Sequence, residues 1–305
     1  MNDDYLWDRS GNPDPEIVAL EDALAPLRWS GKRKQPIRWA ALAAIILIAA
    51  GVAFLWQRSA TLSSWQLVQN HQQNRLRTGQ WIETGPNSAA VVRSTAIGKL
   101  DIQPDSRLQL LNAGKDAQRF SLARGTIHAL IWAPPATFVV DTPGATTIDL
   151  GCEYTLHVGK DGTGVITVEM GWVAFAWHNI ESFIPAGGAC HTRPHHGPDT
   201  PFFNDASPEF KMALSQFDQN GDEKSLRSVL SLARARDAMS LWHLLERTSG
   251  TERAQVFDRY AQLVAVPASV TREAVLRGDA KGLDTAWKAL DLGDIAWWRG
   301  WKRNW

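Results

Sequence analysis

The longest apolar stretch of the chain is residues 39–56, WAALAAIILIAAGVAFLW, which contains no charged side chain. A helix over these residues rises about 27 Å, close to the roughly 30 Å thickness of the hydrocarbon core of a bilayer. A tryptophan stands at each end, where its ring can rest among the lipid head groups. We therefore expect one transmembrane helix at 39–56, with a buried core helix as the alternative.

The basic residues around this stretch predict its orientation. Those before it are Arg28, Lys32, Arg33, Lys34 and Arg38. Only Arg58 follows closely, so the positive-inside rule places the N-terminus in the cytoplasm. A signal peptide cleaved after the small residues near Gly51 and Ala53 is the competing interpretation. The charged region before the apolar run is too long for a signal peptide, and the run itself is longer than a usual signal-peptide core. Both features favour an uncleaved membrane anchor.

The tail before the membrane, residues 1–38, is too short to form its own core, but it predicts one helix. Asp14 can cap the helix, with Pro15 at its first position, and Pro26 should end it near residue 28. Four apolar residues recur along one face: Ile17, Leu20, Leu24 and Leu27. Because a short helix is marginal in water, we expect this face to lie in a partner's groove or on the inner leaflet.

From about residue 62 to residue 183 the pattern is that of short strands. Apolar and polar residues alternate in 80–84, 99–102 and 107–110, whereas 138–140 and 165–168 are more uniformly apolar. Gly, Pro, Asn and Asp punctuate the segments as turn residues. Nothing in the pattern indicates a βαβ crossover, so we expect an all-β fold such as a sandwich, barrel or solenoid.

Six segments of this region resemble, in order and spacing, the motifs of the FecR-like domain family. The glycine, threonine, serine and proline positions of those motifs recur here. The segments are GQWIET at 79–84, QPDSRL at 103–108, LARGTI at 122–127, FVVDTP at 138–143, LGCEY at 150–154 and VEMGWV at 168–173. At 150–154 the family has L-G-T-x-F, so Cys152 and Tyr154 stand where the family carries Thr and Phe.

The resemblance implies a single-pass regulator of the bacterial inner membrane, with a cytoplasmic N-terminus and a periplasmic C-terminal part. In this family a mostly β sensor domain, sandwich or solenoid-like, is coupled through one helix to a tail that controls a sigma factor. Ile17, Leu20, Leu24 and Leu27 would then contact a sigma factor or another transcription component. Best-known members receive their signal from an outer-membrane transporter; here the periplasmic or outer-membrane partner stays unidentified.

The competing function is structural. A membrane-anchored periplasmic protein could bind an envelope polymer or partner through its β-domain without any transcriptional output, the tail serving only as an anchor.

Residues 184–204 are rich in Pro and Gly, and we expect them to form a non-helical connector. Cys190 lies there beside His191, His195 and His196, in a spacing that fits no standard zinc site. Cys190 could form a disulfide with Cys152, the other cysteine of the chain, which would pin the connector to the β-domain. Metal binding and two unpaired structural cysteines are the alternatives.

Residues 205–305 predict an all-α region of successive amphipathic helices. Ser207 can cap a helix that begins at Pro208, and Gly221 should end it rather than belong to a calcium loop. Further apolar positions recur at helical spacing: Leu226, Val229, Leu230, Leu241, Leu244, Leu245, Val256, Tyr260 and Leu263. The last helices are expected at 272–277 and 283–290, followed by a Trp-rich end, 297–305.

Charge and motif content narrow the function further. The formal net charge is zero, which argues against a nucleic-acid binder. The sequence contains no nucleophile elbow, phosphate-binding loop, HExxH motif or dinucleotide fingerprint. We therefore expect no catalytic residues, no cofactor and no metal, and a protein that is not an enzyme.

Overall fold

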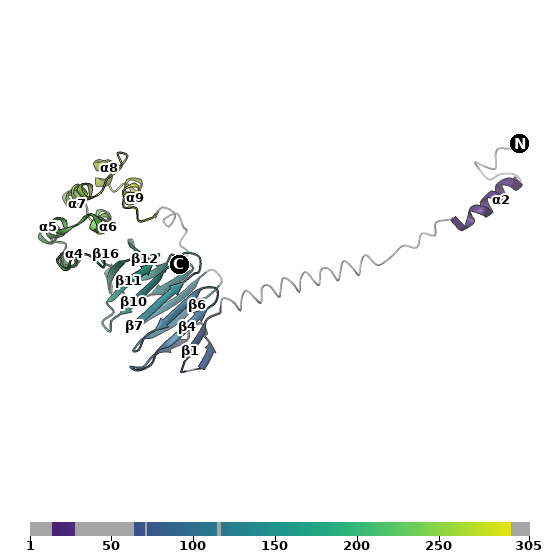
Figure 1. The fold of residues 1–305 in the computed structure, drawn as a ribbon, viewed down its shortest axis with the longest axis horizontal. Coiled ribbons are helices and arrows are strands. Elements are labelled where there is room, and N and C mark those ends of the chain that lie inside the picture. The colour runs from purple at the N-terminus through teal and green to yellow at the C-terminus, as the bar shows by residue number, and fades with distance from the viewer. Residues whose placement is uncertain (1–13, 28–63, 71, 115–116, 294–305) are drawn as a thin grey trace. The chain divides into compact units, whose positions relative to one another are not determined.

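The computed structural model describes residues 14–27, 64–70, 72–114 and 117–293 (Figure 1). The chain divides into two compact units, Met1–Gln57 and Arg58–Trp305. Among the described residues no helix is both long enough and apolar enough to cross a membrane. The predicted transmembrane segment 39–56 and the Trp-rich end 297–305 lie outside the described residues.

The first unit contains helix α2, Pro15–Leu24, which continues as the 3₁₀ turn η1, Ala25–Leu27. Asp14 caps the helix, accepting a hydrogen bond from the N–H of Glu16 at 2.9 Å, and Pro15 is the first helical residue. The cap and the start of the predicted helix are thus confirmed, and the α-helix gives way to the 3₁₀ turn before Pro26, as its missing N–H requires.

The second unit begins with a large mixed β-sheet of sixteen strands. In chain order the strands are β1 Gln66–Gln69, β2 Gln72–Arg75, β3 Trp81–Glu83, β4 Ala90–Ser94, β5 Gly98–Ile102, β6 Arg107–Ala113, β7 Gln118–Ile131, β8 Phe138–Asp141, β9 Thr146–Asp149, β10 Glu153–Val158, β11 Gly164–Met170, β12 Trp172–Trp177, β13 Ile180–Pro185, β14 Gly188–Arg193, β15 Gly197–Pro198 and β16 Phe202–Phe203.

The strands form two layers that share the long strand β7. We call the layer β2-β1-β4-β5-β7-β10-β11-β14 sheet A, with β15 and β16 on β14, and the layer β3-β6-β7-β8-β9-β12-β13 sheet B. Residues 118–124 of β7 pair with β6 and β8, and residues 125–131 pair with β5 and β10. Among the described strands only the β7–β8 pairing is parallel, which makes the sheet mixed.

One apolar core lies between the two layers and draws side chains from both. Trp65, just before β1, packs edge-on against Phe120 of β7 at 5.1 Å between ring centroids and lies 6.0 Å from Phe138 of β8. Two layers around one core correspond to the sandwich-like arrangement among those that the sequence left open.

The predicted connector at 184–204 is wrong for most of its length, because β14, β15 and β16 lie within it. Its glycines occupy the hairpin turns: Gly187 has φ +78° between β13 and β14, and Gly197 has φ +86° where β15 begins. The residues between these turns pair with β11, so the β-region extends to Phe203 instead of ending at residue 183. Gly187 and Gly197, which helped to predict a linker, belong instead to turns between strands.

The chain continues as a helical region, as predicted. Its helices are α4 Pro208–Asn220, α5 Glu223–Leu232, η2 Ala235–Asp237, α6 Ala238–Arg247, α7 Gly250–Leu263, α8 Arg272–Leu276 and α9 Ala280–Lys288. Ser207 caps α4 and Gly221, with φ +64°, ends it, as expected. The last helix begins at Ala280, before the predicted residue 283, because the Asp279 carboxylate accepts from the N–H of Gly282.

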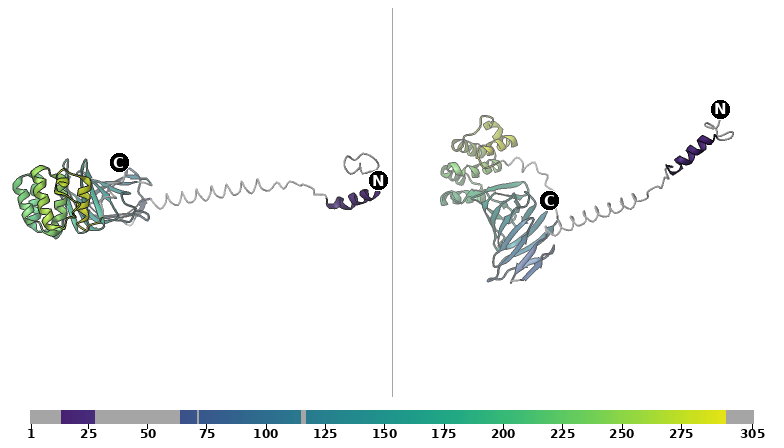
Figure 2. Two further views of the ribbon diagram at one scale, coloured as in Figure 1. Left: turned by 90° about the horizontal axis from the view of Figure 1, so that it is seen from above. Right: turned by 45° about the vertical axis from the view of Figure 1, so that its right-hand side comes forward.

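The helices pack side by side against sheet B and bury a second apolar core (Figure 2). Alternate residues of sheet B face this second core, among them Ile148, Ala174 and Phe183, while their strand neighbours face the core between the sheets. The part of sheet B formed by β9, β12 and β13 is thus covered on both sides, by sheet A and by the helices.

Candidate functional site

Helix α2 presents an apolar face that no described residue covers. Leu20, Leu24 and Leu27 are 62, 51 and 77% exposed, and Ile17 is half-buried. At 100° per residue, Ile17, Leu20 and Leu24 fall within about 60° of the helix circumference. No residue of α2 is buried. Ile17, Leu20 and Leu24 therefore share one face of α2, and Leu27 follows them in the 3₁₀ turn η1; no described residue covers this apolar surface.

In the second unit, a cleft of about 1010 Å³ lies where sheet B and sheet A meet the helix ends. Its walls come from the β12–β13 and β14–β15 turns, from the C-terminal ends of α4 and α6, and from the start of α7 and α9. His178 and His196 are exposed on the two strand turns. A cleft of this size is large enough for a small ligand.

Ion pairs and hydrogen bonds form the floor of this cleft. Arg193 on β14 donates to Asp199 Oδ1 at 2.7 and 2.9 Å and to the backbone oxygen of Asp218. The Asp218 carboxylate accepts from the N–H and the hydroxyl of Thr200. Arg247, the last residue of α6, donates to Thr200 Oγ1 and lies 3.9 Å from Asp218 Oδ1.

This network joins the sheet to the helices at low exposure. The side chain of Asp218 is only 8% exposed and that of Arg247 is 19% exposed. Burial raises the pKa of Asp218 above its usual value, while the Arg247 charge and the Thr200 hydrogen bonds oppose that shift. These groups satisfy one another's hydrogen bonds, so they connect β14 and the β15–β16 loop to α4 and α6.

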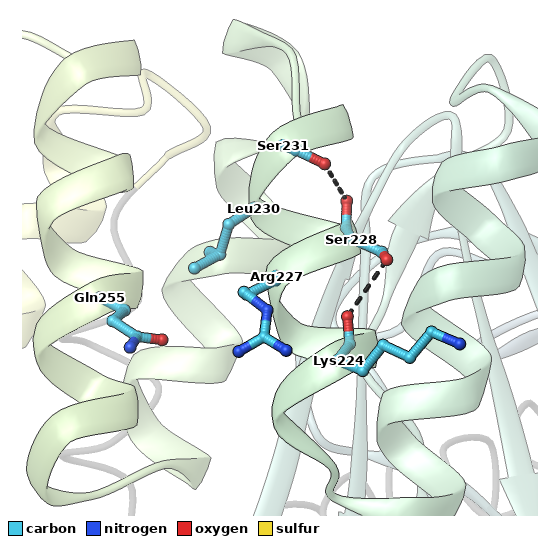
Figure 3. A pocket seen from close by; sticks show the side chains of 6 residues that line it. All are labelled: Lys224, Arg227, Ser228, Leu230, Ser231 and Gln255. Atoms are coloured by element: carbon cyan, nitrogen blue, oxygen red, sulfur yellow. Dashed lines mark hydrogen bonds between the residues drawn. The ribbon is translucent and has the colours of Figure 1, made fainter.

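A second groove, of about 600 Å³, separates α5 from α7 (Figure 3). Arg227 and Leu230 point toward Gln255 on α7, while Lys224 points away. The hydroxyls of Ser228 and Ser231 donate to carbonyl oxygens of their own helix. Arg227 pairs with Glu223 of its own helix, and Gln255 Oε1 is buried without a hydrogen-bond partner among the described residues.

The two cysteines do not form the disulfide that the sequence left open. Both are buried and free. Cys190 on β14 lies opposite Ile166 of β11, which lies opposite Leu156 of β10, and Cys152 is four residues before Leu156. Two strand spacings, about 10 Å, already exceed the reach of a disulfide. The Cys190 thiol donates instead to the backbone oxygen of Asp199.

The metal alternative also lacks support in the described part of the chain, where no group of three His, Cys, Asp or Glu side chains could hold an ion. The ring of His191 stacks on Phe202, and His196 contacts the backbone oxygen of Pro194.

The motif residues of the β-region are connected to one another in the structure. Thr84 Oγ1 donates to the oxygen of Gln103 at 2.7 Å and accepts from the N–H of Ser106. Ser106 Oγ accepts from the N–H of Thr126 at 2.9 Å. A Cβ on Gly125, where β7 passes from one layer to the other, would lie 2.2 Å from Ser106 Oγ. Motif residues from three segments thus form one seam.

Residues 80–174 match the family described as FecR protein. This part of the chain is a FecR domain. No protein of curated function matches the chain. It is similar to two crystal structures of a "putative anti-sigma factor" from Parabacteroides distasonis, each at 14% identity and a TM-score of 0.37. The similarity covers 45% of this chain and 64 or 65% of those chains, slightly less than two thirds.

A second seam of the FecR domain lies where the chain crosses between the two sheets. Gly151 connects β9 to β10 and Gly171 connects β11 to β12, with φ of +88° and +74°. A Cβ on Gly171 would lie 2.2 Å from the backbone oxygen of Gly151, so the two crossings pack backbone to backbone. Both glycines are therefore architectural.

The helical region is joined to the FecR domain by aromatic rings, which the sequence did not predict. Trp287 of α9 lies 5.9 Å from Trp172 of β12, 6.2 Å from Phe183 of β13 and 4.7 Å from Trp242 of α6, measured between ring centroids. The sequence has fifteen tryptophans, but their number does not reveal their partners, because Trp172 and Phe183 lie more than a hundred residues before Trp287.

Proposed function

We propose that this chain is a membrane-anchored signalling regulator whose cytoplasmic tail controls a sigma factor. In this proposal the FecR domain and the helical region lie in the periplasm, and the segment 39–56 crosses the bacterial inner membrane once. The face of Ile17, Leu20, Leu24 and Leu27 contacts the sigma factor or another transcription component. FecR-like families are typically not enzymatic.

The observation that carries the proposal is the free apolar face of α2. A ten-residue helix is marginally stable alone, and its cap and proline contribute only a few kcal/mol at most. Three leucines at 51–77% exposure leave apolar surface in water unless a partner covers it. Docking of such a face in a groove is a common mode of helix recognition.

The membrane arrangement draws its support from the sequence. The apolar run 39–56 separates the basic tail from the FecR domain, and the excess of Lys and Arg lies on the tail side. A single helix can transmit a signal only if two states of the periplasmic part are bound differently by the input. The input partner is a periplasmic or outer-membrane protein or a ligand of the cleft.

The test uses the full-length chain, affinity-tagged and expressed in its native host. One variant carries Leu20→Asp with Leu24→Asp on the apolar face. The matched control carries Val18→Asp with Ala19→Asp, which adds the same charge to the same helix on the opposite side. Proteins that copurify after mild crosslinking are quantified by mass spectrometry.

We expect a sigma factor or a subunit of RNA polymerase to copurify with the wild type and the control, and at least tenfold less with the Leu20/Leu24 variant. A tenfold loss corresponds to about 1.4 kcal/mol, less than the burial of two leucines contributes. Capture that is absent, or equal for all three proteins, would reject the sigma-factor proposal. It would leave the structural, envelope-binding function as the better account.

A further inference from the structure

Four polar side chains of β9 and of the start of β10 are buried in the core between the two sheets. Thr147 and Asp149 lie on the inward face of β9, and Cys152 and Tyr154 lie at the start of β10. Each is at most 1% exposed. The hydroxyls of Thr147 and Tyr154 are buried and have no hydrogen-bond partner in the described part of the chain.

Asp149 occupies the point where the chain leaves sheet B for sheet A. Its Oδ1 accepts from the N–H of Gly151 at 2.7 Å, and its Oδ2 accepts from the Cys152 thiol. The carboxyl group therefore holds the β9–β10 connection at Gly151 by hydrogen bonds. The β11–β12 connection at Gly171 packs directly against it. A change at Asp149 acts on the contact that holds the two layers in register.

The surroundings of Asp149 are poor for a negative charge. Two donors from the described part of the chain reach its carboxyl group, and one of them, the thiol, is weak. The titratable groups that face it are Cys152 and Tyr154 of β10, with Glu169 of β11 acting on Cys152. On β12 its cross-strand neighbour is Val173, which does not titrate. None of these groups carries a positive charge.

We propose that Asp149 is a proton-operated latch: the neutral carboxyl group holds the crossing between the two sheets closed, and its ionisation loosens that crossing. Cys152 stands where the family motif has Thr, and Tyr154 stands where it has Phe and adds a buried hydroxyl near the carboxyl group. The latch belongs to the FecR domain and does not depend on what α2 binds.

The direction of the pH dependence follows from burial. Burial, opposed by the Cys152 thiol and the Gly151 N–H, raises the pKa of Asp149 to about 7, from 3.8. The folded protein then binds this proton more tightly than the unfolded chain. The contribution of Asp149 to stability is therefore complete in acid and is lost as the pH rises toward and through 7.

The test compares the full-length wild type with Asp149→Asn, which keeps the shape of the side chain and its acceptor for Gly151 but cannot ionise. Asp161→Asn is the matched control, because Asp161 is exposed and its pKa is lowered by hydrogen bonds from Thr163. Thermal melting and amide hydrogen exchange of residues 147–156 are measured in detergent from about pH 5 to about pH 8.

In acid, we expect Asp149→Asn to melt at the same temperature as the wild type or at a lower one. At about pH 8 it should melt at a higher temperature than the wild type, and the amide of Gly151 should exchange more slowly. The Asp161→Asn control should follow the wild type throughout. If the difference in melting temperature between Asp149→Asn and the wild type is the same at every pH, the proposal is overturned.

If Asp149→Asn does not fold, Tyr154→Phe decides. It restores the residue of the family motif and makes the surroundings of Asp149 less polar, so the pH at which exchange at Gly151 accelerates should rise. An unchanged transition in this variant would show that the titrating group lies elsewhere.

Discussion

The imidazole of His243 accepts a hydrogen bond from the backbone N–H of Phe183, at 3.0 Å between Nε2 and N. Phe183 lies on β13, the last strand of sheet B, and His243 lies on α6. Because Nε2 accepts, Nδ1 carries the ring proton and donates to the oxygen of Met239 at 2.9 Å. A side chain thus satisfies the edge of the sheet where a further strand would otherwise pair.

This relationship predicts a large cost for His243→Ala. The substitution leaves the buried N–H of Phe183 without an acceptor and a cavity beside Trp242 and Trp287. We expect a loss of about 3 kcal/mol in the free energy of unfolding, measured by urea denaturation. His157→Ala, on the exposed face of β10, should cost less than about 1 kcal/mol. Equal costs would contradict the role of the hydrogen bond.

Local signals in the sequence were sufficient for several elements of this fold. Asp14 with Pro15 and Ser207 with Pro208 specify helix starts through contacts within four residues, so both helices could be predicted. The strand at 138–140 was recognisable because a strand buried on both faces is uniformly apolar. The strand at 165–168 is present as well, but Val165 and Thr167 are only half-buried, so it is buried on one face.

What the sequence did not reveal depends on pairings between distant segments. The strands of 184–204 were missed because Gly187 and Gly197 carry turn geometry that also marks linkers. Asp149 drew no notice because its burial arises only when sheet A covers sheet B. Cys152 and Cys190 could not be judged without the register that separates them by two strands.

The packing of the two crossings predicts that Gly171→Ala is far more damaging than a glycine substitution in open space. A Cβ at residue 171 would lie 2.2 Å from the oxygen of Gly151. Gly79 has a similar φ, +83° against +74°, but no atom within 4 Å of its built Cβ. We expect Gly79→Ala to cost about 1–2 kcal/mol from backbone conformation alone, and Gly171→Ala at least twice that. Denaturation curves that coincide would refute the backbone contact.

The network at the cleft floor predicts a pH-dependent cost for Arg247→Met. Without the Arg247 charge, the buried Asp218 carboxylate keeps only its hydrogen bonds from Thr200. We expect a loss of about 3 kcal/mol near neutral pH. Burial already raises the pKa of Asp218, and removing Arg247 raises it further, so the loss should shrink in acid, where Asp218 is neutral in both proteins.

The control for that prediction is Arg272→Met. Arg272 pairs with Asp258 at 2.8 Å, but both side chains are about half exposed. Its removal should cost less than about 1 kcal/mol. If urea denaturation gives the same loss in free energy of unfolding for Arg247→Met and Arg272→Met, the buried network stabilises the fold no more than a surface ion pair does.

We expect Trp65→Phe to lower the free energy of unfolding more than Trp132→Phe does. The indole N–H of Trp65 donates to Gln118 Oε1 at 2.8 Å inside the core, and its ring packs edge-on against Phe120. Trp132 also donates, to the oxygen of Thr95, but it is 53% exposed. Phenylalanine at residue 65 leaves the buried Gln118 oxygen without this donor, so we expect a loss of about 2 kcal/mol. At residue 132, water can replace the lost partner, and the same exchange should cost less than about 0.5 kcal/mol. Equal urea midpoints for the two variants would contradict the burial of the Trp65–Gln118 hydrogen bond.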